Sequence, residues 1–206
     1  MLIPNCTAVI MAGGESTRMG RDKARIPLAG IPLIDHVIAV IAPLFSQIVV
    51  SVRAPRAEIT LPQLCDQNSD QVGKGRGPMI GIATALEQVE TPWVFALACD
   101  MPFVSPQPIH CMARKRAGQQ VVVPIVDGTV QPLAAFYAKS CLPLMRKQII
   151  SGDRSLQRMI ARMQTTLVDE AELKRYDPEL LSFMDLDCEA DIDAAKAVLR
   201  RRNRNY

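Results

Sequence analysis

The sequence predicts an α/β fold, a single three-layer αβα domain built on a mainly parallel mixed sheet. Short apolar runs rich in β-branched residues alternate with segments of helical length up to residue 124, which is the pattern of successive βα units. A glycine-rich stretch follows the first apolar run, where open α/β sheets usually hold phosphates. At 206 residues the chain has the length of one domain with a substantial core.

The elements follow from local pattern. A proline suits the first turn of the helix that begins at Pro32, and a second glycine turn at Gly77 leads into the next helix. The predicted strands cover residues 8–11, 47–52, 63–65, 93–99 and 120–124, and the predicted helices cover residues 32–41, 78–90 and 108–117. The second half is less regular, with elements expected at 133–138, 139–150 and 155–163 and a closing helix from Glu189.

Composition excludes several classes of protein. Aromatic residues make up only 4% of the chain and the formal net charge is +3, so we expect no nucleic-acid partner. No segment has the length of a membrane span or the form of a signal peptide, so we expect a cytoplasmic protein without a membrane partner. The six cysteines include no C-x-x-C pair, which argues against a zinc site or a disulfide framework. The basic tail, residues 200–206, is expected to be solvated and poorly ordered.

The stretch from Ala12 to Lys23 predicts a phosphate site. Small residues let backbone N–H groups approach an anion closely, and Arg18 and Lys23 add positive charge. The glycines fit neither G-x-G-x-x-G nor the P-loop pattern, which argues against a dinucleotide dehydrogenase or a P-loop ATPase. Asp100 directly follows the apolar strand 93–99, so its carboxylate is expected at the same edge of the sheet. Mg²⁺ favours one or two carboxylates together with substrate phosphates.

Several stretches, taken in order, resemble a known family. They are residues 9–23 with 27–34, Gly77–Ile82, Cys99–Pro102, Gln131–Tyr137 and Gly152–Ser155. Together they resemble the nucleotidyltransferases with a glycosyltransferase-A-like, Rossmann-like fold, and within them the molybdenum cofactor guanylyltransferases. The resemblance implies that residues 1–199 form a nucleotidyltransferase domain, with the donor nucleotide on the N-terminal side and the acceptor on the C-terminal side.

The resemblance also implies a reaction. GMP would pass from GTP to molybdopterin, giving molybdopterin guanine dinucleotide and pyrophosphate, with Mg²⁺ as cofactor. Because the attacking group is already an anionic phosphate, catalysis needs positioning and charge neutralisation more than a strong base. His36 and His110 are accordingly expected to be structural or surface residues. Other molybdenum cofactor assembly proteins are implied as partners, and we expect a monomer or a weak homo-oligomer.

Roles carry over from the family by position. Arg18 and Lys23 would hold the triphosphate, and Asp100 would bind both Mg²⁺ and the nucleotide. Asp66 would contact the nucleotide, although an Asp in such a sequence also suits a turn. Arg53 stands where the family pattern has asparagine, which weakens it as a contact to the base. The nucleotide-binding set is completed by Met11, Ala12, Gly13, Gly14 and Gly77, whose glycines would equally suit tight turns.

The acceptor side leaves alternatives open. Arg154 and Ser155 match an element that would bind the pterin's phosphate, but they also fit a helix start capped by Asp153. Asp185 and Asp187 replace expected asparagines, and on a strand both would face one side. An aspartate pair there is a feature of related cytidylyltransferases, so transfer from CTP, or another nucleotide or acceptor, is the alternative. A nucleotide-binding regulator without turnover is a further one.

Overall fold

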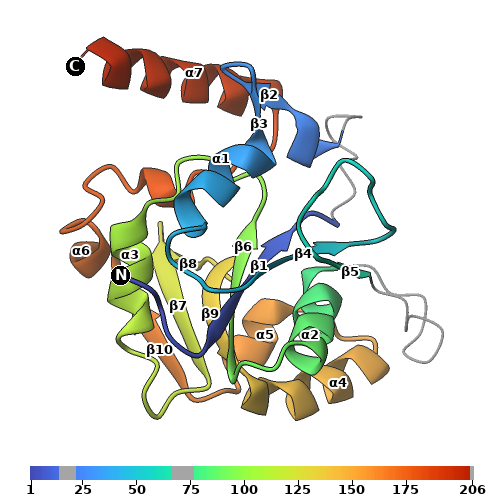
Figure 1. Ribbon diagram of the computed structural model, residues 1–206. Helices are drawn as coiled ribbons and strands as arrows, with labels where there is room; N and C mark the ends of the chain where they lie inside the picture. The colour runs from blue at the N-terminus through green and yellow to red at the C-terminus, as the bar shows by residue number, and fades with distance from the viewer. Residues whose placement is uncertain (14–21, 66–76, 205–206) are drawn as a thin grey trace.

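A mixed sheet forms the middle layer of the molecule, which is described here by a computed structural model covering residues 1–13, 22–65 and 77–204 (Figure 1). Its strands are β1 (Cys6–Met11), β4 (Ile48–Val52), β5 (Gln63–Cys65), β6 (Trp93–Ala98), β7 (Val121–Val126), β8 (Thr129–Val130), β9 (Ala134–Ala138) and β10 (Thr165–Val168). The order is β10-β7-β9-β6-β1-β4-β5, and β8 pairs with β7. The strands β2 (Pro27–Leu28) and β3 (Ile31–Pro32) form a separate hairpin.

The sheet is mainly parallel, as the sequence predicts. β1 lies parallel to β4 and β6, and β5 continues this arrangement beyond β4. Among the strands that the structure describes in this sheet, only β9 and the short β8 run against their neighbours. The carboxyl ends of β1, β4, β5 and β6 therefore meet at one edge, where ligands of such sheets bind.

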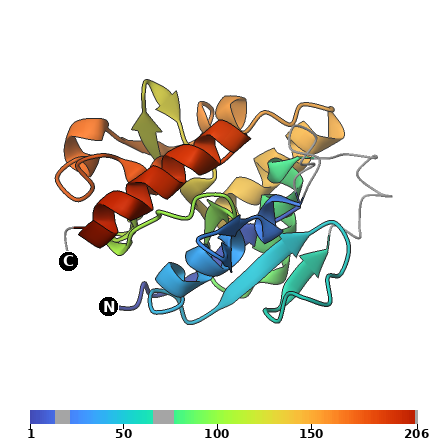
Figure 2. The ribbon, with the colours of Figure 1, turned by 90° about the horizontal axis from the view of Figure 1, so that it is seen from above.

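Helices cover both faces of the sheet. The helices are α1 (Leu33–Ile41), α2 (Pro78–Gln88), α3 (Pro106–Ala113), α4 (Leu142–Ile150), α5 (Leu156–Ile160), α6 (Glu170–Leu173) and α7 (Glu189–Arg204), with 3-10 turns η1 (Lys23–Arg25), η2 (Lys139–Cys141) and η3 (Leu181–Phe183). Buried residues of α1, α3 and α6 share one core cluster, and those of α2, α4 and α5 share the other. Helix α7 packs on the β2–β3 hairpin and crosses above the sheet (Figure 2).

Most predicted elements are present, with shifted ends. The strand at 63–65 is confirmed, and the predicted helix 108–117 is α3, which begins earlier because Ser105 is its N-cap and prolines occupy its first turn. The helix expected over 155–163 is the shorter α5. The hairpin β2–β3 and the elements β8, β10, α6 and η3 were not predicted.

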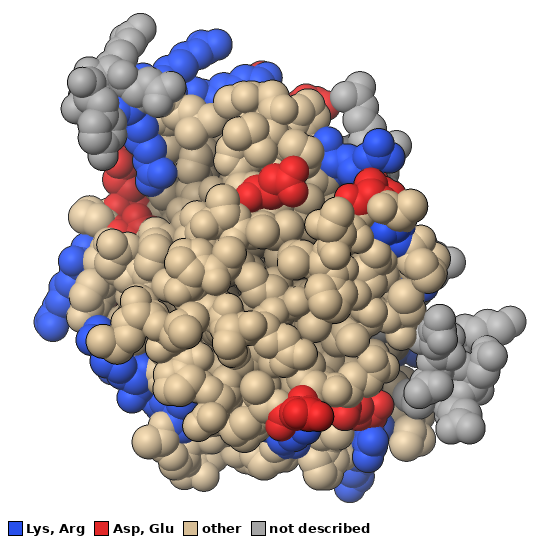
Figure 3. Space-filling model, viewed as in Figure 1, with Lys and Arg blue, Asp and Glu red and all other residues tan. Residues whose placement is uncertain are grey.

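The described part of the basic tail continues helix α7, which ends at Arg204. Arg201 pairs with Glu179 at 3.1 Å, and the guanidinium carbon of Arg202 lies 5.4 Å from the centroid of the Phe103 ring. Charged side chains on the face drawn in Figure 3 stand mainly around its rim. Within the described ranges, no helix is both long and apolar enough to span a membrane.

Helix α2 approaches the sheet closely through Gly81. A Cβ atom at this position would lie 2.5 Å from Ser51 Oγ and 2.6 Å from Met11 Cε. Ser51 belongs to β4 and Met11 ends β1, so this contact sits next to the carboxyl edge of the sheet. The missing side chain therefore sets the distance between α2 and the strand ends.

We predict that Gly81→Ala lowers the free energy of unfolding by roughly 1–3 kcal/mol, since the added methyl group must displace two packed side chains. In an open helix the same change would stabilise. Urea denaturation of the single variant, of Ser51→Ala and of the double variant measures the effect. Removing the serine hydroxyl should restore part of the loss. A Gly81→Ala protein as stable as the parent would contradict the packing described.

Candidate active site

The ends of β1, β4 and β6 bring several predicted residues together. The backbone N–H of Ala12 donates to the carbonyl of Ser51 at 3.0 Å, and that of Cys99 donates to the carbonyl of Met11 at 3.3 Å. A Cβ atom at Gly13 would lie 3.7 Å from Cγ of Arg53, so the exposed Arg53 flanks the start of the glycine-rich stretch. Gly77, with φ of +143°, precedes α2 at the same edge of the sheet.

Lys23 lies at the centre of this edge between two carboxylates. Its Nζ donates to Oδ2 of Asp100 at 2.8 Å and also to Oδ1 of Asp187. The side chains of Lys23 and Asp100 are only 19% and 13% exposed. Burial acts to lower the pKa of Lys23, but the hydrogen bonds to Asp100 and Asp187 outweigh it and the pKa is raised. The ammonium group therefore stays charged.

Lys23, Asp100 and Asp187 lie on three separate segments of the chain, and the first two are placed as follows. Lys23 begins η1, whose N-cap Asp22 accepts a hydrogen bond from the N–H of Ala24. Asp100 follows β6, and its carbonyl accepts from the N–H of Leu186 at 3.1 Å. Asp100 does not cap the following helix, because the N-cap of α3 is Ser105.

The segment that carries Asp185 and Asp187 is not a strand, so that expectation is wrong. It is a stretch without regular secondary structure between η3 and α7, with the fully buried Leu186 between the two aspartates. The N–H groups of Asp187 and Cys188 both donate to Asp191 Oδ2, which fixes this stretch to the start of α7. Burial, followed by the charges of Asp187 and Asp100, raises the pKa of Asp185. Both aspartates therefore lie near Asp100, although their segment is not part of the sheet.

Arg154 and Ser155 lie at the start of α5, on the sheet face covered by α2 and α4. Ser155 is the N-cap and its Oγ accepts from the N–H of Arg158, so the cap is Ser155 and not Asp153. Asp153 instead accepts from the N–H of Ser155 and pairs with Arg158. Arg154 Nε is buried and has no hydrogen-bond partner in the described chain. Gly14, Arg18 and Asp66 lie outside the described residues.

Sequence reasoning missed Asp22 and Arg56. Arg56 stands on the connection from β4 to β5 and pairs with Asp22 at 2.7 Å, between Nη1 and Oδ2. Asp22 was part of the motif before Lys23, but nothing in its local pattern indicates a partner 34 residues away. No short motif surrounds Arg56. His36, as expected, has a structural contact, with Nε2 at 2.9 Å from the carbonyl of Leu28.

Comparison with known proteins places the chain in a family. Residues 8–167 match the family model described as the MobA-like NTP transferase domain. The chain belongs to this family. It is 29% identical over 198 residues to a probable molybdenum cofactor guanylyltransferase of Natranaerobius thermophilus, covering 95% of this chain and 97% of that one. It is 33% identical over 175 residues to a molybdenum cofactor guanylyltransferase of Pseudomonas putida, covering 84% and 91% respectively.

Solved structures agree on the fold. Molybdopterin-guanine dinucleotide biosynthesis protein A from Archaeoglobus fulgidus superimposes with a TM-score of 0.82 at 25% identity, over 95% of this chain and 99% of that one. A 2-C-methyl-D-erythritol 4-phosphate cytidylyltransferase from Thermus thermophilus shares the fold alone, with a TM-score of 0.66 at 16% identity over 93% and 98% of the two chains. This MobA-like chain is thus a nucleotidyltransferase with the predicted single-domain α/β architecture.

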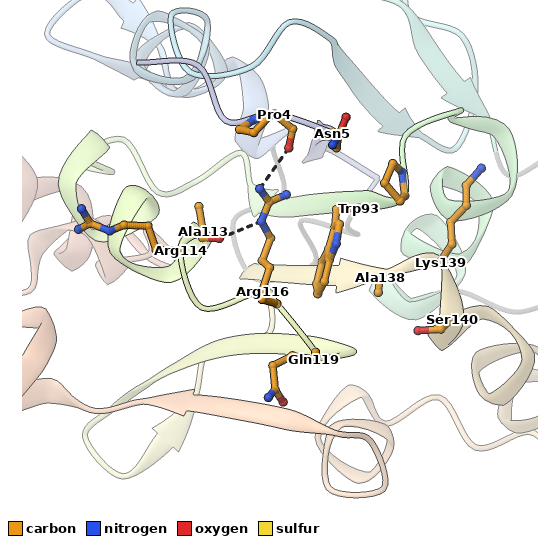
Figure 4. Close-up of a pocket in the computed structure, with 13 residues that line it drawn as sticks. Pro4, Asn5, Trp93, Ala113, Arg114, Arg116, Gln119, Ala138, Lys139 and Ser140 are labelled. Atoms are coloured by element: carbon orange, nitrogen blue, oxygen red, sulfur yellow. Dashed lines mark hydrogen bonds between the residues drawn. The ribbon is translucent and has the colours of Figure 1, made fainter.

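A surface cavity of about 610 Å³ lies at the opposite edge of the sheet, where β6 begins and β9 ends (Figure 4). Arg116 lines it and donates from Nη2 to the carbonyl of Pro4 and from Nε to that of Ala113. The guanidinium carbon lies 5.6 Å from the Trp93 ring centroid and 5.4 Å from that of Phe136. Arg116 therefore packs against the end of the sheet where β6 begins, whereas Lys23 lies near the end of the sheet where β6 ends. The cavity is thus separate from the candidate site.

We predict that Lys23→Met lowers the free energy of unfolding by about 1–3 kcal/mol, because it leaves half-buried carboxylates facing one another without their shared donor. Urea denaturation at neutral pH measures the change. Lys174→Met is the matched control, since Lys174 forms an exposed i,i+4 pair with Glu170 and should contribute nothing measurable. Equal stability of the Lys23→Met variant and the parent would show that the pairing does not hold these segments together.

Proposed function

We propose that this protein transfers GMP from GTP to molybdopterin, forming molybdopterin guanine dinucleotide and releasing pyrophosphate. The observation that carries the proposal is the meeting of Lys23 and Asp100 at the edge where β1 and β6 end. Membership of the MobA-like family, and relatives named as molybdenum cofactor guanylyltransferases, support the choice of donor and acceptor.

In this reaction a terminal phosphate oxygen of the pterin attacks the α-phosphorus of GTP. The bond from that phosphorus to the bridging oxygen of the β-phosphate breaks, and pyrophosphate leaves with the bonding electrons. No residue needs to act as a strong base, since the nucleophile is already an anion. The chain's own groups would position the two phosphates and neutralise the charge that develops on pyrophosphate.

The nucleotide would lie along the strand ends. Met11, Ala12, Gly13 and Gly77 would present backbone groups to it, with Gly14, Arg18 and Asp66 from outside the described residues and Arg53 as a weaker candidate. Lys23 would exchange its carboxylate partners for phosphate oxygens and hold the triphosphate. On the acceptor side, Arg154 is the candidate for the pterin phosphate, since its Nε has no hydrogen-bond partner within the described ranges. Ser155 would support it from the cap of α5.

A Mg²⁺ ion fits the chemistry of this edge. Asp100, Asp185 and Asp187 bring carboxylate groups close to Lys23. Within the described part of the chain, no three or more His, Cys, Asp or Glu residues form a group that could hold a metal ion by themselves. Mg²⁺ usually takes only one or two carboxylates and completes its shell with water and phosphates. Asp100 would hold it, with Asp187 as the second ligand. When bound, the ion neutralises negative charge on the phosphates.

A pyrophosphate-release assay with each of the four NTPs, with and without molybdopterin, tests the proposal. Turnover should require molybdopterin and prefer GTP, and Asp100→Ala should lower it by about a hundredfold or more. Asp193→Ala, an exposed change on α7, is the control. Preference for CTP would replace the guanylyl assignment with a cytidylyl one, and nucleotide binding without any turnover would indicate a regulator.

We predict that Asp187→Asn raises the Mg²⁺ concentration needed for half-maximal activity by roughly tenfold, because a ligand is lost. The same change removes a carboxylate that competes with phosphate for Lys23, so nucleotide binding in the absence of Mg²⁺ should tighten. Asp185→Asn is the comparison, since no ion pair of the described chain joins Asp185 to Lys23. Metal titrations of activity and metal-free binding assays provide both readouts. An unchanged Mg²⁺ requirement would remove Asp187 from the metal site.

A further inference from the structure

Arg56 connects the two sides of the glycine-rich stretch. Its Nη2 donates to the carbonyl of Ala12 at 3.0 Å, just after β1, and its Nη1 donates to Oδ2 of Asp22 at 2.7 Å, just before η1. One guanidinium group therefore bonds to the chain at both described flanks of the segment between β1 and Lys23. The side chains of Arg56 and Asp22 are 22% and 33% exposed, so this pairing is largely shielded from solvent.

The backbone around Arg56 is itself held in place. Gln63, the first residue of β5, accepts from the N–H of Arg56 at 2.8 Å. Its Nε2 donates to the carbonyls of Arg56 and Ile59 at 2.7 and 3.0 Å. Gln63 is in register with Val50 of the parallel strand β4. The guanidinium group is thus presented by a loop that is tied to the sheet, so little further ordering is needed for it to act as a fixed support.

Asp22 connects Arg56 to the backbone of η1, which carries Lys23. Its Oδ1 accepts from the N–H of Ala24 and caps η1, whose first residue is Lys23, while its Oδ2 is held by Arg56. Arg56 also neutralises a carboxylate that would otherwise repel phosphates beside Lys23. A lysine could supply the charge but not the planar fork that bonds to two acceptors in different directions.

We propose that Arg56 is a positioning residue that, through Asp22, fixes Lys23 for the triphosphate. The inference rests on the proposed nucleotidyl transfer for its catalytic consequence, while its structural part concerns η1 alone. Arg56 bonds to no substrate in this scheme; it acts through Asp22 and the carbonyl of Ala12.

The test compares Arg56→Ala, Arg56→Lys and Asp22→Asn with Arg25→Ala. Arg25 is a matched control, because it is an exposed arginine of η1 that lies 3.9 Å from a carboxylate oxygen of Glu58 and does not bond to Asp22 through its side chain in the described residues. Steady-state assays with GTP should show KM for the nucleotide raised about tenfold in Arg56→Ala. Arg56→Lys should recover only part of that loss, and Arg25→Ala should match the parent. In the double variant the effects of Arg56→Ala and Asp22→Asn should be less than additive, since both changes break the link between Arg56 and Asp22.

Hydrogen exchange of the amides of residues 24–26 gives a second readout that needs no nucleotide. Arg56→Ala and Asp22→Asn should speed this exchange about tenfold or more, and Arg25→Ala should not. Unchanged exchange in η1 would overturn the proposal, whatever the activity. Faster exchange with unchanged KM would reduce Arg56 to a structural role and overturn its link to Lys23. Faster exchange in a protein that uses no nucleotide would instead support the positioning of η1 and refute the proposed function.

Discussion

The ammonium group of Lys23 is the point at which distant parts of this chain depend on one another. The two carboxylates that it pairs with among the described residues are 77 and 164 residues further along the chain, one after β6 and the other before α7. Partly buried charges of this kind are stable only when their partners are in place. The position of Lys23 therefore depends on η1, on the end of β6 and on the C-terminal segment together. The hydrophobic packing behind it places Leu186 in the core with Leu28 and Phe103, so Asp187 is directed to the edge of the sheet.

The hydrogen bonds of Lys23 stabilise the fold, and the same ammonium group would serve the proposed chemistry. In the protein alone, Lys23 offsets repulsion between carboxylates. When a triphosphate is bound, phosphate oxygens would take over some of these hydrogen bonds. The lysine can be preorganised for an anion only if something other than the ligand fixes its backbone. Asp22 and Arg56 provide that link from the β4–β5 connection.

Sequence pattern predicted the site residues whose positions depend on short-range structure. Asp100 was predicted because a carboxylate directly after a buried strand must lie at the carboxyl edge of a parallel sheet. Asp187 was singled out from the family resemblance and Lys23 from the charge of the glycine-rich stretch, but no spacing rule indicates that they meet. Arg56 was missed because its function depends on tertiary contacts. The hairpin β2–β3 has strands of two residues each, too short to show periodicity. Asp153 and Ser155 both suit a cap, and only the geometry distinguishes them.

The charge balance among the described residues of the site bears on the proposed metal ion. Among the described residues, Asp22 pairs with Arg56, Asp100 and Asp187 both pair with Lys23, and the charges of Asp187 and Asp100 help to raise the pKa of Asp185. A triphosphate would add further negative charge at the same edge. Repulsion between like charges a few ångströms apart costs several kcal/mol at the dielectric constant of a half-buried site. A Mg²⁺ ion held by Asp100, as proposed above, would lower this repulsion without a complete protein cage. Because an aspartate adds a negative charge that an asparagine would not, Asp187 increases this repulsion directly beside Lys23.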